Sequence, residues 1–252
     1  MNKNNWEKEI KLNFNNAAKN YSHYSSIQKY FSLKIVALIK NLSFINGNWY
    51  DLGSGVGFLA DKIEDQFPNQ NVCRIDFCEN MLFENKPNSE KILWDLNKGF
   101  PIKAKKSTLL VSNFCLHWLN EPKLILKQWF DSLEKGGYMI VCLPTSNSFP
   151  EWKLACNQSK IEYSGISFPE LKNLLNNFKS NEIVTTKTYK YQENFKNIYK
   201  LLRNIINIGA HSTSSERKTT TELRKMQNFW PKNENNTVNL TWEIFIFILK
   251  KT

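Results

Sequence analysis

The stretch Tyr50-Asp51-Leu52-Gly53-Ser54-Gly55-Val56-Gly57-Phe58 decides the fold class of this chain. A short apolar strand runs into an acidic residue, three glycines follow at alternate positions, and a helical pattern begins at Phe58. Glycines let the backbone turn sharply and approach a ligand with no side chain in between. The order strand, glycine loop, helix therefore predicts a nucleotide-cofactor site. The dinucleotide fingerprint has its third glycine where this chain has Phe58, which disfavours a pyrophosphate-bearing cofactor and nicotinamide-dependent oxidoreduction.

Strands and helices alternate after this loop. We expect strands over 49–52, 72–76, 91–94, 108–112 and 138–143, and helices over 58–66, 79–84 and 121–133. Gly136-Gly137 is expected to turn the chain into the last of these strands, and Pro144 to end it. Alternation of this kind predicts an α/β fold, in which a parallel sheet with right-handed crossovers carries helices on both faces.

The segments on either side of this core have different patterns. Apolar residues at helical spacing predict two N-terminal helices, and the C-terminal part predicts a helix over 168–178 and a strand over 182–191. A last strand, 238–248, alternates apolar and polar residues. We expect one domain over 1–252, made of N-terminal helices (1–46), a cofactor-binding core (47–145), an insertion with two helices (194–236) and the last strand (237–252).

The composition limits the kinds of partner that the chain is expected to bind. Its 252 residues carry a net charge of +11, and the pI is near 9.3. Such a balance fits an acidic partner (nucleic acid, anionic membrane or acidic protein) or simply a lysine-rich solvated surface. The basic residues follow no RNA-binding motif, so neither nucleic acid nor membrane is expected.

The remaining composition points to an intracellular setting. The start of the chain has no apolar run of the signal-peptide kind, and the longest apolar stretch, 244–249, is too short to span a bilayer. The five cysteines form no Cys-x-x-Cys pair and the three histidines are scattered, so no metal site is expected. Buried thiols of this kind favour a reducing compartment, and we expect a cytoplasmic protein.

Two further acids strengthen the interpretation of the loop. Asp76 closes the second predicted strand, where a carboxylate can accept both hydroxyls of a ribose. Asp95 follows the third strand, within reach of an adenine amino group. Either residue alone is typical of a helix cap or loop. Together with the glycine loop they mark the carboxyl edge of the sheet, where open α/β sheets bind ligands.

These residues resemble the class I S-adenosylmethionine-dependent methyltransferases, which have a Rossmann-like, seven-stranded, mostly parallel sheet. The stretch Asp51 to Gly57 is similar to their first motif, and Ile75 to Leu82 to their second. Phe100-Pro101 after Asp95, Val111-Ser112-Asn113, and Leu133 to Gly137 match later motifs. The resemblance implies S-adenosyl-L-methionine as methyl donor and S-adenosyl-L-homocysteine as product. It places the donor on nine residues: Asp51, Gly53, Ser54, Gly55, Asp76, Phe77, Asp95, Leu96 and Asn113.

A narrower resemblance covers nearly the whole chain. Four parts of the chain are similar to the BioC family, the malonyl-acyl-carrier-protein O-methyltransferases of biotin synthesis. They are, in the N-terminal helices, Phe14 to Ala18, Tyr21 and Ile27-Gln28; after the fourth strand, Leu116-His117-Trp118; in the insertion, Leu201-Leu202-Arg203, Ile208 to Ala210 and Arg217; and in the last strand, Leu240 to Ile244. The chain departs from that family at His117 (usually Gln), Cys78 (usually Ser) and Trp242 (usually Tyr), and it lacks the glycine-rich tract that often follows the arginine of the insertion.

This resemblance implies the reaction and its partner. The enzyme would methylate the free carboxylate of malonyl-acyl carrier protein to its methyl ester, an early step of pimeloyl and biotin synthesis. The N-terminal helices and the insertion would form a lid that excludes water, with Tyr21 in that lid. Tyr21 is equally an ordinary aromatic on the apolar face of the first helix. The alternative is a methyltransferase for another small carboxylate, an amine or a quinone.

The chemistry makes few demands on the sequence. A carboxylate is ionised at pH 7 and needs no general base, whereas an amine or phenol would, with His117 as the candidate base. We favour instead the interpretation that His117, beside Trp118, helps to wall the cofactor pocket. A malonyl carboxylate calls for a bidentate arginine, for which we expect Arg203 first and Arg217 second, although each is also an ordinary surface-helix residue. The basic insertion could also dock an acidic carrier protein.

Overall fold

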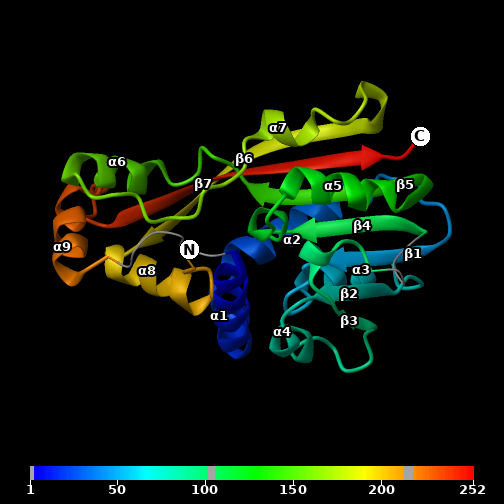
Figure 1. Cartoon of the computed structure of the whole chain (residues 1–252), viewed down its shortest axis with the longest axis horizontal. Helices are drawn as coiled ribbons and strands as arrows, with labels where there is room; N and C mark the ends of the chain where they lie inside the picture. Colours follow the sequence, from blue (N-terminus) through cyan, green and yellow to red (C-terminus); the bar gives the residue numbers. More distant parts are fainter. Residues whose placement is uncertain (1–2, 102–105, 213–217) are drawn as a thin grey trace.

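The computed structural model describes residues 3–101, 106–212 and 218–252, which form a seven-stranded sheet in the order β3-β2-β1-β4-β5-β7-β6 (Figure 1). The strands are β1 Asn48–Leu52, β2 Val72–Asp76, β3 Lys91–Leu93, β4 Ser107–Asn113, β5 Leu133–Pro144, β6 Ile183–Phe195 and β7 Val238–Lys250. The first five run parallel, and β7 lies antiparallel between β5 and β6. The expected mostly parallel, seven-stranded Rossmann-like sheet is confirmed.

The described helices complete the alternation. They are α1 Lys3–Tyr24, α2 Ser26–Ile39, α3 Phe58–Gln66, α4 Glu79–Phe83, α5 Pro122–Asp131, α6 Pro150–Ser159, α7 Leu171–Leu175, α8 Ile198–Asn207 and α9 Thr220–Phe229, with short 3-10 turns η1 Leu96–Lys98, η3 Leu116–Trp118 and η4 Ser180–Glu182. No helix in the described ranges is both long and apolar enough to cross a membrane.

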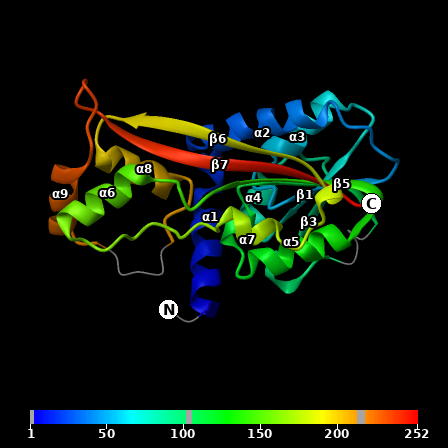
Figure 2. The ribbon, with the colours of Figure 1, turned by 90° about the horizontal axis from the view of Figure 1, so that it is seen from above.

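Two apolar layers hold the helices to the sheet. On β4, Leu109 and Val111 face one layer and Leu110 faces the other, because successive side chains of a strand point to opposite sides. The first layer takes side chains from α2 and α3, and the second takes them from α5 and α7. Figure 2 shows these helix pairs on the two sides of the strands. This sandwich fixes the carboxyl ends of β1, β2 and β4 relative to one another.

One end of the molecule is a helical lobe, by which we mean α6, α8 and α9. The two longest strands, β6 and β7, run from the sheet into this lobe (Figures 1 and 2). Helix α1 lies between the lobe and the rest of the sheet, and it packs against α4 on one side and α8 on the other. The predicted insertion 194–236 therefore begins inside β6 and contributes α8 and α9, while α6 comes from a different part of the chain.

Three details of the predicted structure are wrong. Helix α6 was not expected, although Pro150 at its first turn and Trp152, Ala155 and Cys156 at helical spacing form a short buried face. The helix expected over 168–178 is the five-residue α7, which ends before Asn176-Asn177. The third error concerns the glycine turn before β5.

Gly136-Gly137 lies inside β5 rather than before it. Gly136 has φ +85°, and the pairing of β4 with β5 shifts register between Ser107 and Leu109. The extra residues form a bulge, which lets one strand continue through a left-handed position that only glycine adopts without strain.

Candidate active site

The glycine loop lies where β1 ends. The N–H groups of Gly53 and Ser54 donate to the Ile75 carbonyl oxygen at 2.8 and 3.0 Å, which ties the loop to β2. Gly53 has φ +71°, and a Cβ there would lie 2.3 Å from the Cys115 side chain. At Gly55, with φ +54°, a Cβ would have nothing within 4 Å. The loop is thus tightly packed against Cys115 at Gly53, whereas Gly55 faces space that no protein atom fills.

Asp76 joins the loop to the segment after β2. Its Oδ2 accepts from the Gly55 N–H at 2.8 Å, and its Oδ1 accepts from the Cys78 N–H at 2.8 Å. Burial raises the pKa of Asp76, while these two N–H groups lower it. The carboxylate therefore holds the loop in place and presents its remaining lone pairs to the space in front of it.

One cavity, of about 100 Å³, collects the residues expected to bind the cofactor. All nine line it: Asp51, Gly53, Ser54, Gly55, Asp76, Phe77, Asp95, Leu96 and Asn113. They come from the carboxyl ends of four strands and the turns that follow. The topology brings these ends together because β2, β1 and β4 are neighbours and parallel.

Four buried oxygens in this cavity have no hydrogen-bond partner in the described part of the chain. They are Asp51 Oδ1, Ser54 Oγ, Asn113 Oδ1 and, from α2, Gln28 Oε1. The Asn113 amide N–H2 is already used, since it donates to the Gln28 carbonyl oxygen at 2.9 Å and to Ser32 Oγ at 3.1 Å. A ligand that brings N–H groups and positive charge would satisfy the acceptor oxygens of Asp51, Ser54 and Asn113. S-adenosylmethionine, with its ammonium and sulfonium, is such a ligand.

A second and larger cavity, of about 470 Å³, adjoins the first. Phe14, Tyr21, Gln28, Phe114 and Trp118 line both cavities, so their side chains form the boundary between the two. The rest of its wall is mainly aromatic and aliphatic and comes from the helical lobe, the segment after α6 and β7. These five residues therefore lie between a ligand in the larger cavity and the cofactor cavity.

Two of the predicted residues stand at or near this boundary. The Tyr21 ring stacks on Phe58 at 6.4 Å, and burial raises the pKa of its hydroxyl, helped by the nearby charge of Asp76. His117 lines the larger cavity beside Trp118 and Phe168, and burial lowers its pKa to about 3. His117 is thus neutral at physiological pH and walls the larger cavity, whereas we expected it at the cofactor pocket.

Arg203, the first candidate for the carboxylate clamp, lines neither of the two cavities. Arg203 is exposed on α8, while Leu202, Ile205 and Ile206 of the same helix line the larger cavity. The apolar face of α8 points inward, so its arginine points to solvent, and the geometry gives the Arg203 clamp no support. Arg217 lies outside the described residues. The lysine that does line the cavity is Lys218, whose side chain is 10% exposed and lies 3.6 Å from the exposed Glu162 carboxylate.

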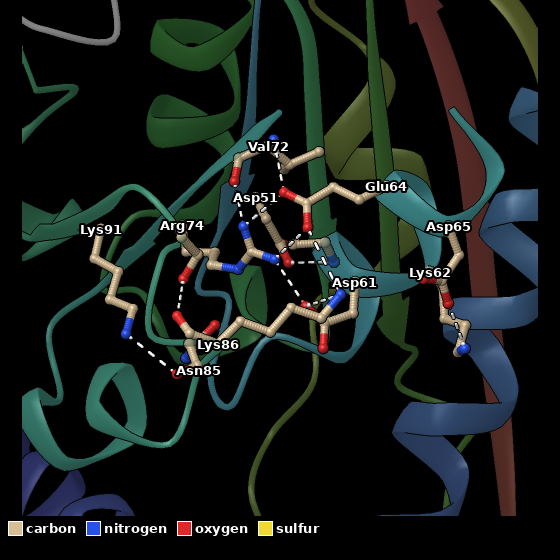
Figure 3. Close-up of polar contacts among 12 residues, drawn as sticks. Asp51, Asp61, Lys62, Glu64, Asp65, Val72, Arg74, Asn85, Lys86 and Lys91 are labelled. Atoms are coloured by element: carbon tan, nitrogen blue, oxygen red, sulfur yellow. Dashed lines mark hydrogen bonds and ion pairs between the residues drawn. The ribbon is translucent and has the colours of Figure 1, made fainter. Parts of the chain in front are cut away.

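A buried ion-pair cluster supports the loop from behind (Figure 3). Arg74, on β2, is fully buried, and its guanidinium donates to both Glu64 oxygens at 2.8 Å and to Asp61 at 2.7 Å. Both acids belong to α3, the helix that begins at the glycine loop. Burial would raise the pKa of Glu64, but hydrogen bonds from Arg74 and from the Val72 N–H lower it. The cluster fixes α3 on β2 and places positive charge behind Asp51.

Asp51 predicts a pH dependence of cofactor binding. Burial raises its pKa to about 7, although Arg74 and the Ala60 N–H act in the opposite direction. A carboxyl with a raised pKa is protonated below pH 7 in the free protein, and a cationic ligand binds its ionised form. Affinity for S-adenosylmethionine should therefore be about tenfold weaker at pH 6 than at pH 8. Calorimetry at both pH values measures this difference. The Asp51→Asn variant should bind S-adenosylmethionine weakly and with the same affinity at both pH values. A pH dependence of its affinity equal to that of the wild type would contradict the assignment.

Some lining residues were missed as cofactor or substrate contacts. Gln28 and Ser32 sit four residues apart on the apolar face of α2, among Ile27, Phe31 and Ile35. Polar residues on a face that is otherwise buried were a signal that could have identified them. Trp94 and Cys115 also line the cofactor cavity, but single residues after strands carry no such signal.

Known proteins match this chain in sequence and in structure. A family profile described as "Methyltransferase domain" matches residues 50–141. The chain is 26% identical to malonyl-acyl-carrier-protein O-methyltransferase 2 of Ilyobacter polytropus, over 97% of this chain and 98% of that protein. It is also 26% identical to malonyl-acyl-carrier-protein O-methyltransferase 2 of Coxiella burnetii, over 98% of each chain.

The fold has solved counterparts as well. The crystal structure of YcgJ from Bacillus subtilis superposes with a TM-score of 0.60, covering 88% of this chain and 99% of that one at 13% identity. The matched domain spans the glycine loop, both downstream aspartates and β4, which are the elements that line the cofactor cavity. The chain therefore carries the methyltransferase domain of an S-adenosylmethionine-dependent enzyme over residues 50–141, and over nearly its whole length it is similar in sequence to the malonyl-acyl-carrier-protein O-methyltransferases of the BioC family.

Proposed function

We propose that this enzyme transfers a methyl group to the free carboxylate of malonyl-acyl carrier protein and so forms the methyl ester. The observation that carries the proposal is the larger cavity, which shares the lining residues Tyr21 and Gln28 with the cofactor cavity. Its volume of about 470 Å³ exceeds what a malonyl group needs, and its apolar wall suits the arm of a carrier protein behind the acyl group. The nearly full-length similarity to enzymes of that name supports the same substrate.

The partner would be an acidic carrier protein. The helical lobe and the turns beside it expose seven cations: Lys160, Lys196, Lys200, Arg203, Arg224, Lys225 and Lys232. None of them forms an ion pair with another residue of the described ranges. Basic residues around the cavity wall would steer and orient an acidic protein, mainly through the rate of association. In this arrangement Arg203 serves docking rather than clamping.

The reaction asks mainly for alignment. S-adenosylmethionine supplies a methyl group on a positively charged sulfur. A carboxylate oxygen of the acceptor donates a lone pair to the methyl carbon, the carbon–sulfur bond breaks, and its electron pair stays on sulfur. No proton moves, so the site needs no general base, in agreement with the neutral, buried His117. The protein excludes water and holds the two reactants in line, which contributes several kcal/mol.

Mass spectrometry of the carrier protein tests this function. Incubation of the enzyme with S-adenosylmethionine and malonyl-acyl carrier protein should add the mass of one methylene group, and base treatment should remove it as expected for an ester. Acetyl-acyl carrier protein is the control, because it has the same arm and carrier but no free carboxylate. Turnover of an amine, a quinone or another small carboxylate, with malonyl-carrier protein left unmodified, would contradict the proposal.

A further inference from the structure

The boundary between the two cavities has an unusual composition. Of the five residues that line both, Phe14, Phe114 and Trp118 are aromatic, and the other two, Tyr21 and Gln28, are polar and uncharged. No lysine or arginine lines the cofactor cavity in the described part of the chain, and Lys218 lines only the larger cavity. The methyl group and its acceptor must meet at this boundary, so the described groups that can hold the acceptor there are neutral.

Gln28 is held in place but only partly satisfied. It lies on α2 with 7% of its surface exposed, and its carbonyl oxygen is fixed by the Asn113 side chain at 2.9 Å. Its side-chain Oε1 is buried and has no partner in the described ranges. A buried polar atom without a partner costs roughly 1–3 kcal/mol. A site that keeps such an atom where two cavities meet is built to bind a ligand.

Tyr21 supplies the second group. It is the residue of α1 that lines both cavities together with Phe14, and the Tyr21 carbonyl oxygen accepts from the Ser25 N–H at 3.0 Å where α1 meets α2. Burial raises the pKa of its phenol, so the hydroxyl keeps its proton and remains a donor. An amide and a phenol from two adjoining helices thus line the same boundary.

We propose that the Gln28 amide and the Tyr21 hydroxyl hold the acceptor carboxylate at this boundary by hydrogen bonds from uncharged donors. The inference rests on the proposed function, since it takes the acceptor to be a carboxylate. A half-turn of the amide about its last carbon–carbon bond exchanges oxygen and nitrogen, so the buried position can present N–H2 to an anion. Gln28 is then the residue that orients the nucleophile.

Uncharged donors suit this reaction for an electrostatic reason. The carboxylate loses its negative charge as the oxygen–carbon bond forms, and sulfur loses its positive charge as the carbon–sulfur bond breaks. A guanidinium against the attacking carboxylate would stabilise the charged reactants more than the transition state, and only stabilisation that persists in the transition state accelerates the step. Neutral hydrogen bonds orient the oxygen at a smaller cost.

Gln28→Met tests the proposal, because methionine has a similar length and no hydrogen-bonding group. We expect kcat/KM for malonyl-acyl carrier protein to fall about 10- to 100-fold, the effect of losing one hydrogen bond to a charged group. The dissociation constant for S-adenosylmethionine should change less than about threefold. The matched control is Gln128→Met on the exposed side of α5, which should leave both quantities unchanged.

Gln28→Glu separates contact with the acceptor from a merely structural role. A second carboxylate beside the acceptor repels it at pH 8, so this variant should be less active than Gln28→Met there. Its activity relative to the wild type should recover as the pH falls and the new side chain takes up a proton. A structural defect would not produce this pH profile.

Binding gives a readout that does not depend on turnover. Malonate titrated into the enzyme saturated with S-adenosylhomocysteine should bind about tenfold more weakly to Gln28→Met than to the wild type. Equal malonate affinity, no binding to the wild type, or a weakened S-adenosylmethionine affinity with normal acceptor kinetics would each overturn the inference. A wild-type enzyme that binds malonate in this way but leaves malonyl-carrier protein unmethylated would instead contradict the proposed function alone.

Discussion

Asp76→Asn is expected to weaken the binding of S-adenosylmethionine about 100-fold. By its resemblance to the class I enzymes, the Asp76 carboxylate accepts both hydroxyls of the ribose, and each such bond to a charged acceptor contributes roughly 1.5–3 kcal/mol. The amide of asparagine keeps the shape but has no charge and a single acceptor oxygen. A net loss of about 2–3 kcal/mol corresponds to about 100-fold in the dissociation constant. Isothermal calorimetry with S-adenosylmethionine and S-adenosylhomocysteine measures it.

The variant also disturbs the loop, so its fold must be checked separately. Asp76 accepts the Gly55 and Cys78 N–H groups, and the amide can satisfy only one of them with its oxygen. Urea unfolding in the absence of ligand separates loss of stability from loss of affinity. Asp65→Asn is the control, because Asp65 is exposed on α3 and pairs only with Lys62. An unchanged dissociation constant in Asp76→Asn would remove the ribose assignment.

The core of the fold could be predicted because its local signals agree with its packing. The strand 72–76 and the helix 58–66 occur with the predicted bounds, since apolar periodicity, the glycine loop and Pro68 all point to the same boundaries. The cofactor residues followed for the same reason. Each lies at or just after the carboxyl end of a parallel strand. Because these strand ends meet at one edge of the sheet, the position of a residue in the sequence also predicts where it lies in the fold.

The acceptor site could not be predicted in the same way, because it depends on packing between distant segments. The larger cavity is walled by α1, α6, α8 and β7, whose relative placement no local pattern encodes. The helical spacing of Leu202, Ile205 and Ile206 did indicate the inward face of α8, and Arg203 lies off that face. The choice of Arg203, made from its bidentate chemistry and from the family resemblance, overlooked this periodicity, whereas the polar Gln28 on the apolar face of α2 was a usable signal.

Arg74→Met is expected to lower the free energy of unfolding by about 3 kcal/mol, the low end of the loss when one partner of a buried ion pair is removed. Asp61 and Glu64 retain 28% and 22% side-chain exposure, so water hydrates part of their charge once the guanidinium is gone. Lys86, with its Nζ 3.3 Å from Asp61, compensates further. Urea unfolding of the ligand-free protein measures the change, and Arg224→Met, an exposed arginine on α9, is the control.

The loss of stability in Arg74→Met has two possible causes, the unpaired carboxylates and the smaller volume of the new side chain, and a second substitution separates them. Adding Glu64→Gln to Arg74→Met removes one of the two carboxylates that the arginine neutralises, so the double variant should be more stable than the single one. If the loss of stability comes from a cavity left by the smaller side chain, the Glu64→Gln substitution will not raise the free energy of unfolding. Arg74→Met should also weaken S-adenosylmethionine binding at pH 7, because the Asp51 carboxyl loses the positive charge that lowers its pKa and is more often protonated. A cluster between β2 and α3 would then control the cofactor site through the charge of a single buried carboxylate.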